Sequence, residues 1–177
     1  MKSRTSILAV LAIFAALTGE AGETIQVAPL VRDGRVLVSF RLDNGFTEEV
    51  RESIESGLET TISYEVALRR SVSGWFDKTL AEATVSATAR YDNLTRLHQL
   101  SRTIDGRGEQ PLVSEHREAV KAWMTEFDRL SLFSTAVLEP NREYYVRVRA
   151  RTRPRFGWFF WPWDRGATGH ATFTFIL

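Results

Sequence analysis

The segment IQVAPLVRDGRVLVSFRL, residues 25–42, decides the fold class because it contains two strands and the turn between them. Asp33-Gly34 is a two-residue hairpin signal that separates the runs 25–32 and 35–42. Pro29 lacks a backbone N–H, which predicts that the first strand lies at a sheet edge. The second strand alternates between apolar and mostly polar positions, so one face is buried. Its inward side chains are Val36, Val38, Phe40 and Leu42.

The same alternation recurs along the chain and predicts an antiparallel meander. Two runs have clear inward faces, one made of Ile62, Tyr64, Val66 and Leu68, and the other of Ala83, Val85, Ala87, Ala89 and Tyr91. Asp92-Asn93 is a tight turn into a further strand at 95–104, and a turn-rich loop follows at 105–111. Three later strands are predicted at 132–138, 143–152 and 170–177.

Two amphipathic helices interrupt the strands. The first has Thr47 as N-cap and Gly57 at its end, with Val50, Ile54 and Leu58 on one stripe. The second is predicted from a cap at Ser114 to about Phe127. Its apolar face is Val120, Trp123, Met124 and Phe127. The fold class is therefore α+β, an antiparallel sandwich or meander of about seven to eight strands with two helices.

The N-terminus has the three parts of a secretory signal peptide. Lys2 and Arg4 precede an uncharged apolar run at 7–17, and Gly19 and Ala21 place small residues before a cleavage site. We therefore expect a signal peptide at 1–21 and a single α+β domain at 22–177. The predicted location is the periplasm of a cell envelope, with peripheral membrane contact left open. An uncleaved anchor is the alternative, although a spanning helix needs roughly 20 apolar residues.

The charge balance and the lack of cysteine limit which kinds of partner, cross-link and anchor the chain can have. Without Lys2, Arg4 and Glu20, the 23 basic and 22 acidic residues become 21 and 21, so the expected mature chain is close to neutral. This balance and the expected export argue against nucleic acid as a partner. The sequence contains no cysteine, so it forms neither a disulfide nor a lipoprotein anchor.

Three segments resemble a family of secreted bacterial proteins that is known only as a domain of unknown function, DUF4390. They are LETTISYEVALRR at 58–70, GWFD at 74–77 and YDNLTRLHQLSR at 91–102. The resemblance covers roughly residues 36–153 and implies an exported, noncatalytic envelope protein that works beside membrane-bound machinery. It carries over no functional residues. The sequence after Arg153 departs from the family pattern.

No motif for catalysis, a cofactor or a metal is present. His98, His116 and His170 are far apart and lack metal-ligand spacing. There is neither a GxSxG nucleophile elbow nor a phosphate-binding loop. We therefore predict a protein that is not an enzyme and that needs no cofactor.

The most distinctive feature is an aromatic hairpin loop at 154–168. Its aromatic side chains are Phe156, Trp158, Phe159, Phe160, Trp161 and Trp163. The preceding strand places Arg147, Arg149, Arg151 and Arg153 on one face, opposite Tyr144, Val146, Val148 and Ala150. Two interpretations stay open: an exposed tip that contacts a membrane or partner, or a loop that completes the core.

The first functional hypothesis is a binding or accessory protein that touches a membrane surface or a membrane-protein partner through the aromatic loop and the arginines. The second is a carrier of an apolar ligand, for which the small residues Ala83, Ala87 and Ala89 would leave space. The third is a hydrolase, which would require His98 or His170 to cluster with carboxylates in a cleft. The sequence does not predict the oligomeric state.

Overall fold

The computed structural model describes residues 23–71, 77–154 and 166–176, and the hairpin predicted at its start is present. β1 (Thr24–Arg32) and β2 (Arg35–Asp43) pair antiparallel, with Arg32 opposite Arg35. Asp33 and Gly34 have φ angles of 50° and 72°. Two consecutive positive φ angles are those of a type I′ turn, whose twist matches the flanking strands. The Asp33-Gly34 hairpin is therefore confirmed.

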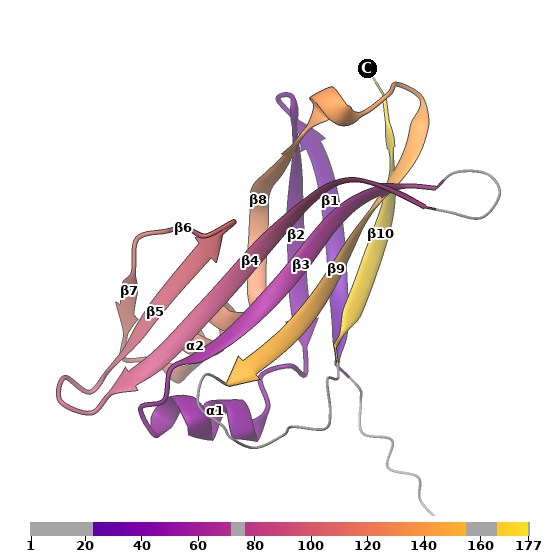
Figure 1. The fold of residues 1–177 in the computed structure, drawn as a ribbon. Coiled ribbons are helices and arrows are strands. Elements are labelled where there is room, and N and C mark those ends of the chain that lie inside the picture. The colour runs from indigo at the N-terminus through magenta and orange to yellow at the C-terminus, as the bar shows by residue number, and fades with distance from the viewer. Residues whose placement is uncertain (1–22, 72–76, 155–165, 177) are drawn as a thin grey trace, which may run out of the picture.

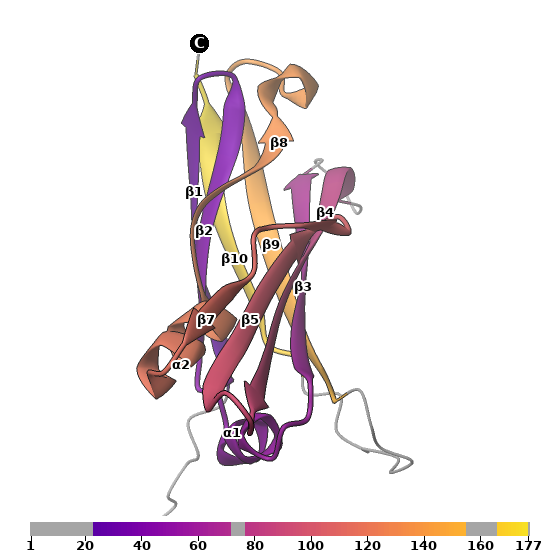
Figure 2. The same ribbon diagram turned by 90° about the vertical axis from the view of Figure 1, so that its left-hand side faces the viewer.

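All strands pair antiparallel, in two sheets (Figures 1 and 2). The smaller sheet has the order β1-β2-β8, with β8 at Glu126–Ser134 and β1 at the edge, as Pro29 predicts. The larger sheet has the order β10-β9-β3-β4-β5-β6, and β7 also pairs with β5. Its strands are β3 (Thr60–Arg70), β4 (Lys78–Asp92), β5 (Leu97–Ile104), β6 (Arg107–Gly108), β7 (Leu112–Ser114), β9 (Arg142–Pro154) and β10 (Thr168–Phe175). The described residues thus form ten strands, two of them very short, in the predicted α+β sandwich.

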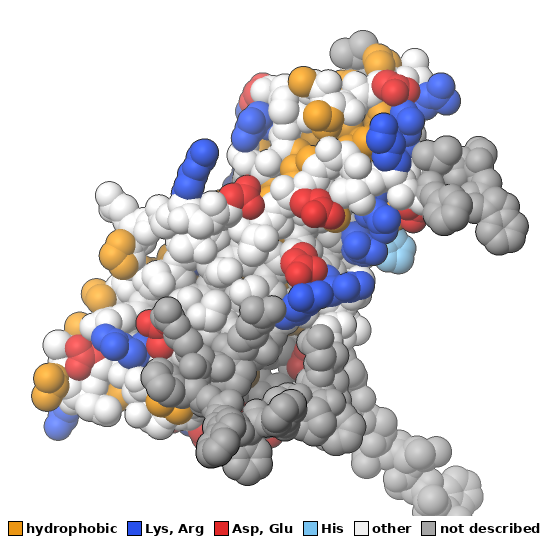
Figure 3. All heavy atoms as spheres, in the orientation of Figure 1, with side chains coloured by type: hydrophobic (Ala, Val, Ile, Leu, Met, Phe, Trp, Pro, Cys, Tyr) orange, Lys and Arg blue, Asp and Glu red, His pale blue; other side chains and the backbone are white. Residues whose placement is uncertain are grey.

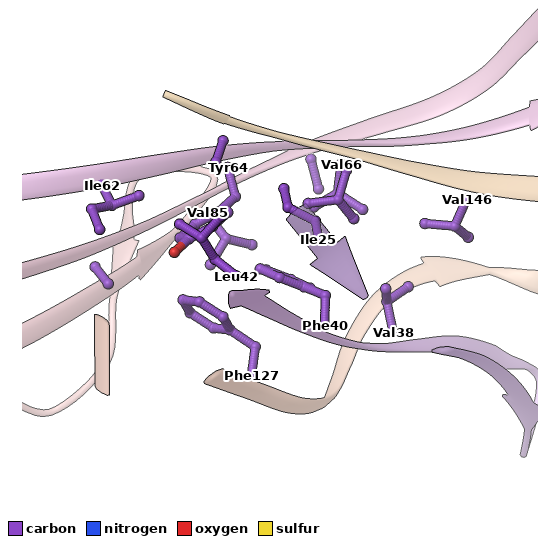
Figure 4. Packing of buried hydrophobic residues seen from close by; sticks show 14 of the residues in the cluster. Ile25, Val38, Phe40, Leu42, Ile62, Tyr64, Val66, Val85, Phe127 and Val146 are labelled. Atoms are coloured by element: carbon purple, nitrogen blue, oxygen red, sulfur yellow. The ribbon is translucent and has the colours of Figure 1, made fainter. Parts of the chain in front are cut away.

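The core lies between the two sheets, where the alternating apolar side chains meet. Phe40 of β2 stacks on Phe127 of β8 with ring centroids 4.4 Å apart. Tyr64 of β3 lies 5.0 Å from each of these rings (Figure 4). The predicted inward faces of β2 and β3 are all buried.

Two short helices cover one end of the sandwich (Figures 1 and 2). α1 (Glu48–Glu55) begins at the predicted cap, where Thr47 Oγ1 accepts a hydrogen bond from the N–H of Val50. Val50 and Ile54 are buried, but Leu58 is 45% exposed. The expected stripe therefore stops short, because the helix has ended and Gly57, with φ of 87°, turns the chain away.

The second helix and the strand after it correct the sequence prediction. α2 spans Arg117–Thr125, its N-cap is His116 rather than Ser114, and Phe127 belongs to β8. Ser114 Oγ accepts from the N–H of His116 and so shapes the turn before the helix. The strand predicted at 132–138 instead starts at Glu126 and ends at Ser134, followed by the short 3-10 helix η1 (Thr135–Val137).

The N-terminal and C-terminal strands close one side of the sandwich. A Cβ atom on Gly169 of β10 would lie 2.0 Å from the carbonyl oxygen of Ile25 in β1. The missing side chain thus lets the two backbones approach. β9 runs on to Pro154, which is opposite Thr60 at the start of β3. β9 therefore ends on the side of the sheet where the helices lie (Figure 1).

Candidate interaction surface

The predicted arginine row lies on the outer face of the larger sheet. Tyr144, Val146, Val148 and Ala150 of β9 are buried, whereas Arg147, Arg149 and Arg151 are partly exposed on the opposite face. Residues two apart in a strand are about 7 Å apart along it, so these three side chains leave the backbone in a row on one face. Figure 3 shows basic side chains gathered on the part of this face formed by β9 and β10. The predicted alternation in β9 is therefore confirmed for these residues.

One carboxylate meets this row. Glu65 of β3 is opposite Arg149 in the register, and its Oε1 lies 3.2 Å from Nη1 of Arg151. No ion pair joins Arg147 or Arg149 to an acidic side chain among the described residues. On the other side, Arg147 is opposite His170 of β10. The row thus carries more positive charge than its neighbours neutralise.

The rest of this face consists mainly of serine and threonine side chains. Thr61 and Thr88 join their hydroxyls at 2.8 Å across β3 and β4, and Ser63 and Ser86 do so at 3.2 Å. These cross-strand pairs occupy the hydroxyls and keep the face polar. The basic row therefore borders a polar surface rather than an apolar patch.

Tyr145 marks the end of the row farthest from the helices. Its hydroxyl donates a hydrogen bond to the carboxylate of Asp77, and the guanidinium of Arg69 lies 5.9 Å from its ring centroid. Partial burial and the Asp77 carboxylate raise the pKa of Tyr145. Tyr145 thus stays protonated and ties β9 to the start of β4.

The aromatic part of the predicted site lies outside the described residues. This applies to Phe156, Trp158, Phe159, Phe160, Trp161 and Trp163, and to the side chain of Arg153. The strand on which Arg153 sits is described, and it continues the β9–β3 ladder opposite Thr61. Both interpretations of the aromatic loop therefore stay predictions.

The three histidines do not come together. His98 of β5 is buried, with Nδ1 3.2 Å from the carbonyl oxygen of Ser114, whereas His116 and His170 are exposed. His98 does share a pocket with Glu55 and Glu118. This is the clustering of a histidine with carboxylates that the hydrolase hypothesis requires, and the hypothesis stays untested.

The small residues proposed to leave space for a ligand are covered. Ala83, Ala87 and Ala89 are buried on the inner face of β4, and both α1 and α2 contact that strand. This arrangement lends no support to the carrier hypothesis, which stays an untested alternative.

Sequence reasoning missed Arg102, a cation on the inner face of β5. Its guanidinium carbon lies 4.1 Å from the ring centroid of Trp123 and 4.3 Å from that of Phe127. It donates to the carbonyl oxygens of Trp123 and Glu126, at the C-terminal end of α2. A cation there satisfies carbonyls that the helix leaves free and complements the helix dipole. Burial lowers the pKa of Arg102.

An outer groove of about 830 Å³ lies beside Arg102. Its lining combines small apolar residues such as Ala28 and Ala122 with the acidic side chains of Glu126 and Asp128. A hydrogen bond from Ser39 and the neighbouring Arg129 lower the pKa of Asp128. The mixed charges of this groove indicate no particular ligand.

Two features are absent from the described residues, a metal-ligand cluster and a membrane-spanning helix. No group of three or more His, Cys, Asp or Glu side chains there is arranged to hold a metal ion. No helix within the same residues is long and apolar enough to cross a membrane.

The fold and this surface define a two-sheet antiparallel sandwich with a basic strand face. The family model of a domain of unknown function (DUF4390) matches residues 21–154, most of the chain, and the protein belongs to that family. The match ends at residue 154, which agrees with the expected departure from the family pattern after Arg153. No curated protein and no solved structure matches the chain.

Proposed function

We propose that this protein is an exported envelope accessory protein that acts by binding rather than catalysis, and that β9 carries its membrane-facing surface. The observation behind the proposal is the row Arg147, Arg149 and Arg151, which has Glu65 as its one acidic partner among the described residues. Arginines next to an anionic lipid surface contribute on the order of 1 kcal/mol each. The row thus supports weak, salt-sensitive attachment to phosphate groups.

The sequence of the β9–β10 connection supports the same proposal. Trp and Phe side chains favour the boundary between water and lipid, and residues 155–165 contain six of them directly after the arginine row. Arginines and aromatic residues on one hairpin would act together, the first on lipid phosphates and the second on the interface. A membrane-protein partner with an acidic surface is the alternative for the same residues.

Co-sedimentation with vesicles tests the proposal. The variant R147Q/R149Q/R151Q should lose binding to vesicles rich in phosphatidylglycerol, and wild-type binding should weaken as salt is raised. The matched control is R32Q/R35Q/R41Q, which removes three arginines from the smaller sheet and should bind like the wild type. Equal loss in both variants would show that only the total charge matters and would contradict the proposal.

The aromatic loop and the membrane-protein alternative need separate samples. W158A/W161A/W163A should abolish binding with an unchanged circular dichroism spectrum if the loop is an exposed tip. Unfolding of that variant would instead place these side chains in the core. Binding to native membranes but not to pure lipid vesicles would favour a membrane-protein partner.

A further inference from the structure

One side chain beside the arginine row can change its charge. His170 of β10 lies directly opposite Arg147 of β9, and the next pair on the same face is Thr168 with Arg149. Side chains directly opposite each other on an antiparallel pair are about 5 Å apart at Cβ, and diagonal ones about 7–8 Å. His170 is therefore a neighbour of both arginines. Figure 3 shows a histidine side chain next to the basic side chains of this face.

The ring of His170 is exposed and forms no ion pair with an acidic side chain of the described residues. It approaches Tyr145 edge-on, with ring centroids 6.4 Å apart. The hydroxyl of Tyr145 is already bonded to the carboxylate of Asp77. The imidazole thus gains or loses its proton without breaking an ion pair among these residues.

The other charged and titratable groups around His170 keep their charge between pH 5 and 8. β10 itself has none, and the neighbouring elements contribute Glu143, Tyr145, Arg147, Arg149 and Arg151 of β9, Glu65 and Arg69 of β3, Asp77 before β4, and Glu23 and Arg32 at the two ends of β1, which packs against β10. Arginine is permanently charged, and carboxyl groups ordinarily titrate near pH 4. Histidine is the side chain that ordinarily titrates in this range. His170 is therefore the group that sets how the charge of the row varies with pH.

We propose that His170 makes the attachment of this surface to anionic lipid pH-dependent, with tighter binding when its ring is protonated. The inference rests on the proposed function, because it takes Arg147, Arg149 and Arg151 as the lipid-facing row. Without lipid, a proton on His170 meets the repulsion of two arginines. A lipid phosphate over the row attracts that additional charge instead. Protonation and lipid binding therefore favour each other, and each strengthens the other by the same factor.

Co-sedimentation at two pH values tests the proposal with the full-length protein processed by its own host. Phosphatidylglycerol vesicles are used at pH 7.5 and 5.5, on either side of the value of about 6.5 at which histidine ordinarily titrates. The wild type should bind about fivefold more tightly at the lower pH, which is the effect of one more basic charge at an anionic lipid surface. His170→Gln should lose most of this gain. His170→Arg should bind at pH 7.5 as tightly as the wild type does at pH 5.5, because its charge is permanent.

His116→Gln is the matched control. His116 is also exposed, but it is the N-cap of α2 and does not lie on the sheet face, so this variant should keep the full gain. An equal gain in His116→Gln and His170→Gln would overturn the inference and leave the proposed function intact, and so would a wild type that binds equally at both pH values. Binding that R147Q/R149Q/R151Q does not reduce at either pH would contradict the proposed function and the inference together. Because His170 is exposed, its variants should fold, and circular dichroism checks this.

Discussion

The phenolic hydroxyl of Tyr64 donates a hydrogen bond to the main-chain carbonyl oxygen of Met124 at 2.7 Å. Tyr64 is on β3 and Met124 is in the last turn of α2, so this bond joins the larger sheet to the helix that leads into the smaller sheet. Both side chains are fully buried. The bond therefore fixes α2 to the core through a group that has no access to water.

Tyr64→Phe should destabilise the fold by about 1–2 kcal/mol, because the carbonyl of Met124 then stays buried without this donor. The ring and its contacts with Phe40 and Phe127 are kept. Urea unfolding checks the value. A loss below about 0.3 kcal/mol would mean that a water molecule replaces the hydroxyl.

The same tyrosine predicts a loss of stability at alkaline pH. Burial raises the pKa of Tyr64, whereas an unfolded tyrosine titrates near pH 10. The folded state thus holds its proton when the unfolded state releases it, and this contribution is fully present below about pH 10 and is lost above it. The stability difference between the wild type and Tyr64→Phe should shrink between pH 9 and 11, by at most about 1.4 kcal/mol per pH unit. A constant difference in urea midpoints over this range would contradict the prediction.

Phe127→Ala should cost about 3–5 kcal/mol, because it leaves a cavity beside Phe40 and Tyr64 and removes one face of the Arg102 contact. Leu94→Ala is the control, since Leu94 is 96% exposed and its loss should cost less than about 0.5 kcal/mol. Thermal unfolding of both variants measures the contrast. Similar melting temperatures would show that Phe127 is not in the core.

Gly169→Ala should destabilise more than Gly34→Ala. At Gly169 the added Cβ meets the backbone of Ile25 and forces β1 and β10 apart, at about 3 kcal/mol or more. At Gly34 the added atom has room, and the positive φ costs about 1 kcal/mol. Hydrogen exchange should be faster in β1 of the first variant. Unchanged β1 protection would indicate that these two strands do not touch.

Arg102→Met should cost about 2–3 kcal/mol, because the carbonyls of Trp123 and Glu126 lose a charged donor while the apolar contact with the rings is kept. Arg90→Met is the matched control. Arg90 is exposed and bonds only to the side chain of Gln99 in the hydrogen-bond pattern of the described residues, so its loss should cost less than about 0.5 kcal/mol. Equal stabilities would show that the end of α2 does not depend on the guanidinium.

The strands β2, β3 and β4 were predictable from the sequence because each has a buried face, whereas the end of α2 and the start of β8 were not. Val120 and Met124 face the core from the helix, and Phe127 faces the same core from β8. Phe127 follows Val120 and Met124 at helical spacing by coincidence. The apolar pattern in the sequence therefore conceals the change from helix to strand at Glu126. The sequence does not predict β7, because Leu112 and Val113 are both exposed and show no apolar alternation. This strand is defined only by its pairing with β5.

The arginine row was predictable because β9 alternates strictly, but its shortage of acidic partners depends on which strands lie beside it. The register of β3 against β9, which places Glu65 opposite Arg149, is not visible in either strand alone. Arg102 did leave a signal. Arg102 lies on the same inward face of β5 as His98, Leu100 and Ile104. A charged residue at such a buried position requires a partner. The pocket at His98 left none, since its lining comes from distant segments of the chain.

The ladder between β3 and β9 joins residues 60–70 to residues 144–154, and β10 then covers the free edge of β9. The larger sheet thus stays incomplete until the residues of β10, up to Phe175, have left the ribosome. Such long-range pairing makes folding slow. Until β10 arrives, β9 is an open strand edge that invites aggregation. We therefore expect the newly made chain to depend on a chaperone or on rapid transport, and a chain cut before residue 166 to accumulate as insoluble protein.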